Sequence, residues 1–251
     1  MALLTDGMIT SLADLQALDS AILETAKDEG VDLAAKSAVA EEELGLELAA
    51  FLLRMRGCGA DPAQAGTADV SRVVVTPPLK RWHALQTLAA VYGDVYNSQL
   101  NDRYLGKWKH FSQLARETAD VLYELGVGIA GSPVPRATKP ALAGSGPAAA
   151  GVYAVKVAWR SATAVQGAPS EAAMWDTANG SQVVVNPGAA PAGANGYDVY
   201  AGISEESLAR QNASPVPAGQ MWVMPPEGLV PGPPPGNGQT PDTWIRRVRK
   251  L

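Results

Sequence analysis

Few residues in this 251-residue chain have the types and spacing that catalysis or metal binding requires. His83 and His110 are its only histidines, and neither belongs to a His-x-x-x-His or His-Glu-x-x-His pattern, so the sequence predicts no zinc site. Cys58 is the only cysteine, which excludes an intrachain disulfide and a cysteine metal cluster. It lies in a Gly-Cys-Gly segment with no activating neighbour, so we interpret it as a small residue in a turn and not as a nucleophile.

The carboxylates and the glycine-rich segments predict no active site either. Glu41, Glu42 and Glu43 are consecutive, so on a helix their side chains point in different directions and favour a solvated or subunit-facing acidic surface. The chain has no Gly-x-Gly-x-x-Gly or Gly-x-x-x-x-Gly-Lys-Ser/Thr motif. Gly144-Ser-Gly146 lies among prolines and alanines and lacks the strand–turn–helix context of a nucleophile elbow. We therefore expect neither enzyme activity nor a cofactor.

Two groups of residues have instead the composition of protein contacts. At the C-terminus an aromatic and an aliphatic side chain lie beside four bases, which is typical of an interface anchor but also fits a solvated terminus. These residues are Trp244, Ile245, Arg246, Arg247, Arg249 and Lys250. An aromatic and charged corner between two predicted helices is the second group, and we interpret it as a subunit contact or an ordinary helix break. Its residues are Asn101, Asp102, Arg103, Tyr104 and Lys107.

Helical periodicity dominates the half of the chain that holds the corner. The segments Ser11–Gly30 and Asp32–Arg56 have apolar residues at helical spacing and are predicted to be one helix each. Thr76–Gly126 predicts two more helices, with a good N-cap before two prolines at its start and a glycine suited to end a helix at its finish. Residues 1–130 therefore form a predicted four-helix bundle-like domain. We expect Trp108→Ala to destabilise it by ~3 kcal/mol or more, as a large-to-small core change does.

The hydrophobic period changes from 3.6 to 2 in the second half of the chain. Residues 131–150 are rich in proline, glycine and alanine, show no periodicity and are predicted to be a linker. Residues 151–230 contain short apolar–polar alternations between Gly/Pro turns, which predict a small antiparallel Ig-like β-sandwich. Residues 231–251 begin with a proline-rich run that cannot pair in a central strand, and they are predicted to be an extended basic tail. The sequence thus predicts an α+β protein of two domains.

Charge is divided unevenly along the chain. Residues 1–130 carry 18 acidic and 11 basic residues, net −7, whereas residues 131–251 carry 7 and 9, net +2. The total of −5 gives no general attraction to nucleic acid. A cationic tail on an acidic body favours docking onto an acidic surface, for example on a neighbouring copy. We expect no signal peptide and no membrane span, because the N-terminus lacks a basic region followed by an apolar run and no segment approaches ~18 consecutive apolar residues.

Several runs resemble proteins of tailed bacteriophages. VVVTPPLKRWHALQTLAAVY (residues 73–92) and YNSQLNDRYLGKW (residues 96–108) are similar to sequences encoded in phage structural modules, and the four-helix plan resembles the head-to-tail adaptor, or connector, proteins. Three pieces of the second half are similar to the Ig-like or fibronectin-III-like additions of phage structural proteins. They are Tyr153–Trp159, Gly167–Glu171 and Gly196–Tyr200. In a fibronectin-III domain the Gly-Tyr-x-Val-Tyr-like strand usually comes first, whereas here it comes last, so only an Ig-like sandwich is predicted.

The resemblance implies a homo-oligomeric ring, with twelve copies expected, that connects the portal protein to a tail or nozzle protein. It places the chain in the neck of the virion, assembled in the bacterial host cytoplasm, with genomic DNA passing through without sequence-specific binding. The acidic residues of the helical domain suit such a channel because like charges keep DNA from sticking. Residues 242–251 would insert into the portal rim, with Trp244 and Ile245 filling a groove. A chain without them is expected to fold but not to join portal particles.

Two other hypotheses remain open at this stage. In the first, the β-domain decorates the virion or binds host-surface glycans while the helical domain anchors it, and a glycan array probed with residues 150–240 would test this. In the second, the protein is an enzyme such as a lysin, although no acid–base or metal constellation favours that class.

Overall fold

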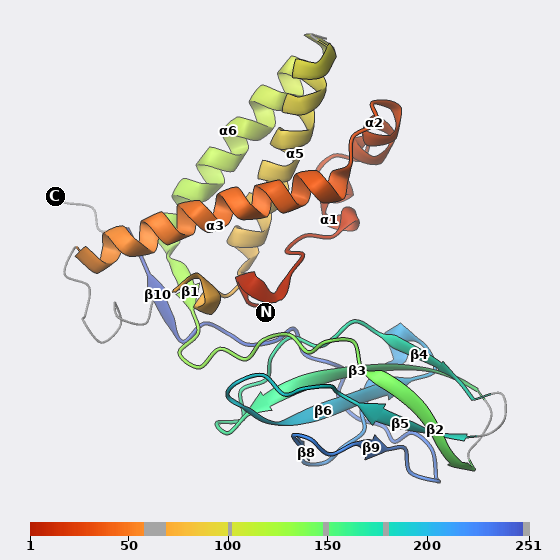
Figure 1. The fold of residues 1–251 in the computed structure, drawn as a ribbon. Helices are drawn as coiled ribbons and strands as arrows, with labels where there is room; N and C mark the ends of the chain where they lie inside the picture. Colours follow the sequence, from red (N-terminus) through yellow and green to blue (C-terminus); the bar gives the residue numbers. More distant parts are fainter. Residues whose placement is uncertain (58–68, 100–101, 148–150, 178–180, 248–251) are drawn as a thin grey trace. The chain divides into compact units, whose positions relative to one another are not determined.

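The computed structural model describes residues 1–57, 69–99, 102–147, 151–177 and 181–247 (Figure 1). The chain folds into two compact units, a helical unit and a β unit. The helical unit comprises Leu4–Gly131 and Pro241–Leu251, and the β unit comprises Met1–Leu3 and Ser132–Thr240. The predicted α+β protein of two domains is therefore confirmed, but the chain passes between the units three times and not once.

Most of the helical unit is a pair of long helices crossed by a third. The helix α5 (Pro77–Gln99) and the helix α6 (Asp102–Leu125) lie side by side, and α3 (Leu33–Gly57) crosses them (Figure 1). The remaining elements are short. They are η1 (Leu4–Asp6), α1 (Leu12–Leu18), α2 (Ile22–Asp28), η2 (Val70–Arg72), β1 (Val127–Ile129) and β10 (Thr243–Ile245).

The first helical segment begins as predicted but is divided in two. Ser11 and Asp14 form a capping box, in which the Asp14 N–H donates to Ser11 Oγ at 3.3 Å and the Ser11 N–H donates to Asp14 Oδ2 at 2.7 Å. The prediction of one helix over Ser11–Gly30 is wrong, because the chain breaks at Asp19 between α1 and α2. The Asp19 carboxylate accepts a hydrogen bond from the Ala21 N–H at 3.2 Å, and this local bond competes with helix continuation.

The α5–α6 pair begins and ends where the sequence predicts, but the predicted side-chain cap at its start does not form. The Lys80 N–H donates to Thr76 O at 2.9 Å, so Thr76 is the residue that precedes α5. Among the described residues its buried hydroxyl has no hydrogen-bond partner. Pro78 removes one of the two N–H groups from which an N-cap side chain can accept. At the other end Gly126 has a φ of +113° and its N–H donates to Leu122 O at 2.7 Å, as predicted for a helix-ending glycine.

The core of the helical unit lies where α3 crosses the α5–α6 pair. The Phe51 ring of α3 lies 4.5 Å from the Tyr123 ring of α6, and Trp82 of α5 meets the same tyrosine nearly edge-on at 5.8 Å. Apolar residues of α3 at helical spacing form a buried stripe that faces this core. It consists of Leu44, Leu48, Phe51, Leu52 and Met55.

The β unit is a two-layer antiparallel β-sandwich. One sheet has the order β2-β5-β9, with strands β2 (Ala141–Pro147), β5 (Ser181–Asn186) and β9 (Trp222–Val223). The other has the order β4-β3-β6-β7, with β8 also paired to β6. Its strands are β3 (Val152–Ser161), β4 (Ala173–Asp176), β6 (Ala194–Gly202), β7 (Ala209–Arg210) and β8 (Val216–Pro217), and the short turn η3 (Glu205–Ser207) follows β6. Side chains of both sheets, such as Val183 and Trp159, fill one core.

The segment 131–150, predicted to be a linker, contains a strand of the sandwich. The strand β2 pairs with β5 from Ala141 opposite Asn186 onward, and Val134 before it is buried in the β-unit core. The linker prediction is wrong here because an edge strand is held by backbone hydrogen bonds, which alanine, glycine and serine make as well as apolar residues do. The pattern of side chains therefore contained no alternation from which β2 could be predicted.

The segment predicted as one extended tail, 231–251, is divided between the two units. Its proline-rich first part lies along β7 of the β unit, where the Arg210 N–H donates to Pro233 O at 2.9 Å. Its last part belongs to the helical unit, where β10 pairs with β1. The two described parts of this segment are thus each held against a folded unit and do not form one free tail.

Candidate functional site: assembly surfaces of the helical unit

The C-terminal strand β10 is part of the fold of the helical unit, although residues 231–251 were predicted to be an extended tail. It pairs antiparallel with β1, with Val127 opposite Ile245 and Gly128 opposite Trp244. Side chains alternate along a strand, so Ile245 packs against the helical core while Trp244 points outward with 47% of its surface exposed. Ile245 is thus half-buried within its own chain, whereas Trp244 is exposed; a contact of either residue with a partner stays a prediction.

The bases of the C-terminal group also have different surroundings. Arg247 donates from Nη1 to Asp120 Oδ1 at 3.0 Å, and its guanidinium lies 5.1 Å from the centre of the Tyr123 ring. Burial and the nearby Glu47 carboxylate raise the pKa of Tyr123 to about 12, although Arg247 acts in the opposite direction. Arg246 is exposed beside Trp244. The other two predicted bases, Arg249 and Lys250, lie outside the described residues.

The predicted corner before α6 is in large part an internal contact. Tyr104 is only 5% exposed, stacks on Tyr92 with ring centroids 6.0 Å apart, and donates from its hydroxyl to Glu29 Oε1 at 2.6 Å. It therefore ties α6 to the end of α2, and its predicted role as a subunit contact is wrong. Asp102 and Arg103 are exposed, with the Arg103 guanidinium 5.3 Å from the Tyr104 ring centre. Asn101 lies outside the described residues.

Lys107, the last residue of the corner, closes a three-residue cluster with Asp19 and Tyr92. Its ammonium donates to Asp19 Oδ2 at 2.7 Å and to the Tyr92 hydroxyl oxygen at 2.9 Å, while that hydroxyl donates to Asp19 Oδ2 at 2.5 Å. Burial alone would raise the pKa of Asp19, but the hydrogen bonds from Lys107 and Tyr92 outweigh burial and lower it. Burial would likewise lower the pKa of Lys107, yet Asp19 and Tyr92 raise it. Both groups thus stay charged, and the cluster ties α6 to the α1–α2 break. The Lys107 side chain is still 42% exposed, so its contact with another subunit stays a prediction.

His83 lies fully buried between helices. Its Nε2 lies 3.1 Å from Ser37 O, a carbonyl that only accepts, so Nε2 carries the proton and Nδ1 accepts from the Thr10 hydroxyl at 2.9 Å. Burial lowers the pKa of His83, and the hydrogen bond to the Ser37 carbonyl offsets part of this effect. The imidazole is therefore neutral and joins α5 to α3 and to the segment before α1.

The described residues contain no group of three or more His, Cys, Asp and Glu side chains that could hold a metal ion. Cys58 lies outside them. The three consecutive acids of α3 point around the helix as predicted, because Glu41 is half-buried with a pKa raised by burial while Glu42 and Glu43 are exposed. Among all the residues that the structure describes, no helix has both the length and the apolar character needed to cross a membrane.

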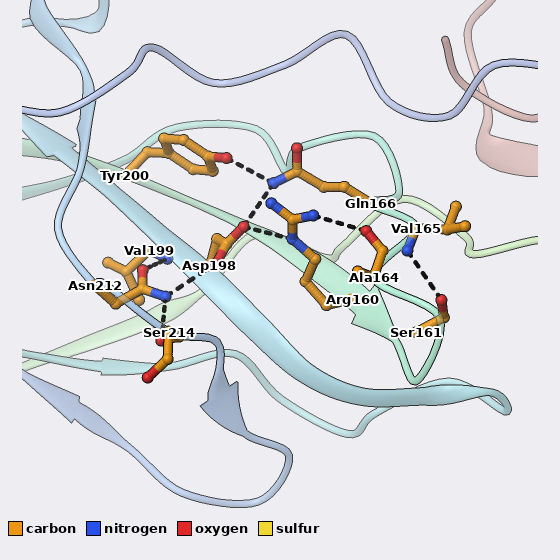
Figure 2. Close-up of polar contacts among 10 residues, drawn as sticks. All are labelled: Arg160, Ser161, Ala164, Val165, Gln166, Asp198, Val199, Tyr200, Asn212 and Ser214. Atoms are coloured by element: carbon orange, nitrogen blue, oxygen red, sulfur yellow. Dashed lines mark hydrogen bonds and ion pairs between the residues drawn. The ribbon is translucent and has the colours of Figure 1, made fainter.

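The β unit has its own polar cluster on the sheet that contains β3 and β6 (Figure 2). Asp198 is 1% exposed, and its carboxylate accepts from Arg160 Nε at 2.7 Å, Gln166 Nε2 at 3.0 Å and Asn212 Nδ2 at 2.9 Å. Gln166 Nε2 also lies 2.6 Å from the Tyr200 hydroxyl, whose pKa is raised by burial. The buried charge is thus neutralised and hydrogen-bonded on both carboxylate oxygens, which makes this cluster a tie between strands and loops.

One exposed apolar surface was missed at the sequence level. The outer face of α3 carries three large apolar side chains at intervals of seven residues, with exposed fractions of 47%, 72% and 67%. They are Val39, Leu46 and Leu53, which we call the α3 stripe. The seven-residue spacing is present in the sequence. The sequence alone could not show whether these three side chains face the core or the solvent, because the inward face of the helix was not known.

A second apolar surface lies on the α5–α6 pair, where the start of α5 faces the end of α6. It is a groove of about 500 Å³ with mainly apolar walls, which we call the α5–α6 groove. Its lining residues are Pro77, Pro78, Arg81, Glu117, Thr118 and Val121. Val121 is 50% exposed in it, and Arg81 and Glu117 place one base and one acid at its sides.

A third depression, of about 530 Å³, lies among α3, α5 and α6 and is polar. Trp108 forms part of it, stacked on Tyr96 at 5.5 Å and so close to Gly93 that a Cβ there would meet the indole Nε1 at 3.0 Å. Three of the charged groups along it have partners: Lys36 and Asp94 form an ion pair at 2.8 Å, and Glu43 accepts a hydrogen bond from Gln86 at 2.8 Å.

Comparison with known proteins gives no relative for this chain: no protein family, no curated protein and no solved structure matches it.

Proposed function

We propose that this protein is a structural adaptor of the neck of a tailed bacteriophage, acting by assembly and not by catalysis. The observation that carries the proposal is the contrast between the polar and the apolar side chains of the helical unit. Three of its polar side chains, Asp19, Lys107 and His83, are engaged in contacts within the fold. Its α3 stripe and α5–α6 groove are apolar and exposed, as expected of surfaces that other proteins cover.

In this proposal the exposed side of β10 contacts the portal. Trp244 offers a large aromatic surface, and Arg246 beside it offers a positive charge suited to an acidic groove. Trp244 lies in this strand and Arg246 follows its last residue, so both side chains lie at an element of the helical unit's fold. The acidic character of residues 1–130, net −7, favours placement of the helical unit beside the DNA path.

The assignment of the C-terminal contact is tested with particles that carry a portal but no tail. Wild-type protein is expected to add a ring at the portal vertex, visible by electron microscopy. Trp244→Ala combined with Arg246→Glu is expected to lose this binding while keeping the wild-type melting temperature. Met221→Ala, which truncates a 59% exposed side chain of the β unit, is the matched control and should bind normally. If wild-type protein leaves portal particles unchanged, the adaptor function is wrong.

Deletion of residues 242–251 is no longer a suitable test. It would remove all of β10 and, with Ile245, a side chain that packs against the helical core. A loss of portal binding would then follow from a damaged helical unit as well as from a lost contact.

The compact β unit supports a second candidate, in which the protein decorates the virion or binds glycans of the host. This unit has its own core and forms a separate body of the chain. A glycan array probed with the full chain, in the presence and absence of portal particles, separates the candidates. Specific glycan binding without any binding to portal particles would favour this second function.

A further inference from the structure

The α3 stripe and the α5–α6 groove lie on opposite sides of the helical unit. The stripe points away from the residues that α3 buries, such as Leu48 and Phe51. On α6, Tyr123 faces α3 through its contact with Phe51. Val121 is two residues away, which at 100° per residue turns it about 160° around the helix axis from Tyr123. The groove that Val121 lines therefore opens on the side of the α5–α6 pair that faces away from α3.

Two complementary surfaces on opposite sides of one unit allow copies to join head to tail. A contact between different surfaces of identical copies continues from copy to copy and closes into a ring when the rotation permits. A contact of one surface with itself would stop at a dimer. We infer that the α3 stripe of one copy docks into the α5–α6 groove of the next copy, an inference that rests on the proposed ring and assigns its subunit interface.

The charges beside the two surfaces favour this pairing. Glu42 is exposed one helical turn before Leu46 of the stripe, and Arg81 is exposed on the wall of the groove. Arg54 follows Leu53 at the end of the stripe, and Glu117 lies on the opposite wall of the groove. Each surface therefore offers one acid and one base to the other. Such charges at the rim of an apolar contact select the partner and fix its orientation.

The apolar part of the contact has a matching shape at its centre. Leu46, the most exposed residue of the stripe, is a single side chain projecting from a helix. The groove has apolar walls contributed by Pro77, Pro78 and Val121 and is large enough, at about 500 Å³, for one such side chain and its neighbours. Val39 and Leu53 lie seven residues to either side of Leu46, about 10 Å along the helix, and extend the contact beyond the groove.

Disulfide trapping tests the contact directly. Cys58 is the only cysteine of the chain, so Cys58→Ser provides a background in which every crosslink comes from introduced residues. In this background, Leu46→Cys combined with Val121→Cys is expected to give a ladder of crosslinked multimers under mild oxidation, in concentrated solution or on portal particles. Each single substitution is expected to give none. Crosslinked dimers from Leu46→Cys alone would place the α3 stripe against itself and overturn the inference. Absence of the ladder from the double variant under both conditions would also overturn it.

Charge reversal provides the second arm of the test. Glu42→Arg and Arg81→Glu are each expected to weaken self-association about tenfold, measured by sedimentation, because each places like charges opposite one another. The double variant is expected to recover most of the loss. Glu24→Arg, at an exposed position of α2, is the matched control and should have no effect. Single variants that associate normally, or a double variant weaker than both, would overturn the inference.

The outcome for the interface is distinguishable from the outcome for the proposed function. A crosslinked ladder without any binding to portal particles would keep the head-to-tail contact and reject the phage adaptor. Binding to portal particles without the ladder would keep the adaptor and reject this interface.

Discussion

Gly128 and Pro241 lie so close together that a Cβ atom on Gly128 would come within 2.6 Å of Pro241 Cγ. Gly128 is the middle residue of β1, and Pro241 precedes β10 on the returning chain. The Asp242 carboxylate strengthens the same junction by accepting a hydrogen bond from the Gly131 N–H at 2.6 Å. The absence of a side chain at Gly128 is thus a condition for the C-terminal segment to join the helical unit.

Gly128→Ala is therefore expected to destabilise the helical unit by about 1–3 kcal/mol, because either β1 or the Pro241 ring must shift to admit the methyl group. Thermal unfolding followed by circular dichroism measures the effect. The matched control is Gly106→Ala in α6, where an added Cβ has no heavy atom within 4 Å and alanine favours the helix. Equal melting temperatures for the two variants would contradict the tight junction.

Asp19→Asn is expected to destabilise the fold by about 1–3 kcal/mol at neutral pH, because it removes the charge that Lys107 and Tyr92 contact. The exposed pair of Lys36 and Asp94 gives the control, since Asp94→Asn is expected to cost less than about 1 kcal/mol. The pKa of Asp19 is lowered in the fold from its ordinary value of 3.8, so its contribution is present above that pH and is lost as the pH falls further. In strong acid the wild-type protein and Asp19→Asn should therefore have similar free energies of unfolding.

His83 should give a separate pH dependence at a higher pH. Its pKa is lowered in the fold from the ordinary value of 6.5, so the unfolded chain binds the proton more tightly. The stability that neutral His83 supplies is complete above pH 6.5 and declines as the pH falls below it. Melting temperatures at pH 7.5 and pH 5.5 are expected to differ more for wild type than for His83→Gln. Identical differences would show that the proton does not couple to folding at this residue.

Trp108→Ala is expected to destabilise the helical unit by about 2 kcal/mol. This value is below the ~3 kcal/mol expected for a fully buried tryptophan, because Trp108 is only half-buried against Gly93 and Tyr96. Chemical denaturation with urea measures the change. Trp244→Ala makes the same substitution at a tryptophan that is 47% exposed, and it should leave the unfolding free energy nearly unchanged.

The parts of the fold that repeat a simple pattern could be predicted from the sequence. The inward stripe of α3, the end of α6 at Gly126 and the strands β3 and β6 follow from periodicity and glycine placement, and the structure contains all of them. The strands β2 and β10 could not be predicted, because their pairing depends on backbone groups and on partners far away in the sequence. Local side-chain patterns contain no information on such pairings.

The corner before α6 shows the same limit for the candidate site. Aromatic and charged residues such as Tyr104 and Lys107 have the composition of an interface, and the same composition suits an internal tie. The structure distinguishes the two because Glu29 and Asp19, each more than 70 residues earlier, receive their hydrogen bonds. The α3 stripe was missed for the opposite reason, since Leu46 and Leu53 have the composition of a core.

The return of the chain through β10 makes the β unit, apart from Met1–Leu3, an insertion within the helical unit. The strands β1 and β10 pair antiparallel, and residues 130–242 connect them. The two ends of this connection meet at the hydrogen bond from the Gly131 N–H to the Asp242 carboxylate. Such an insertion can be exchanged or removed without separating the ends that hold it. A short turn in place of residues 132–240 would join two points that already touch, so the helical unit could acquire or lose this passenger domain in a single genetic step.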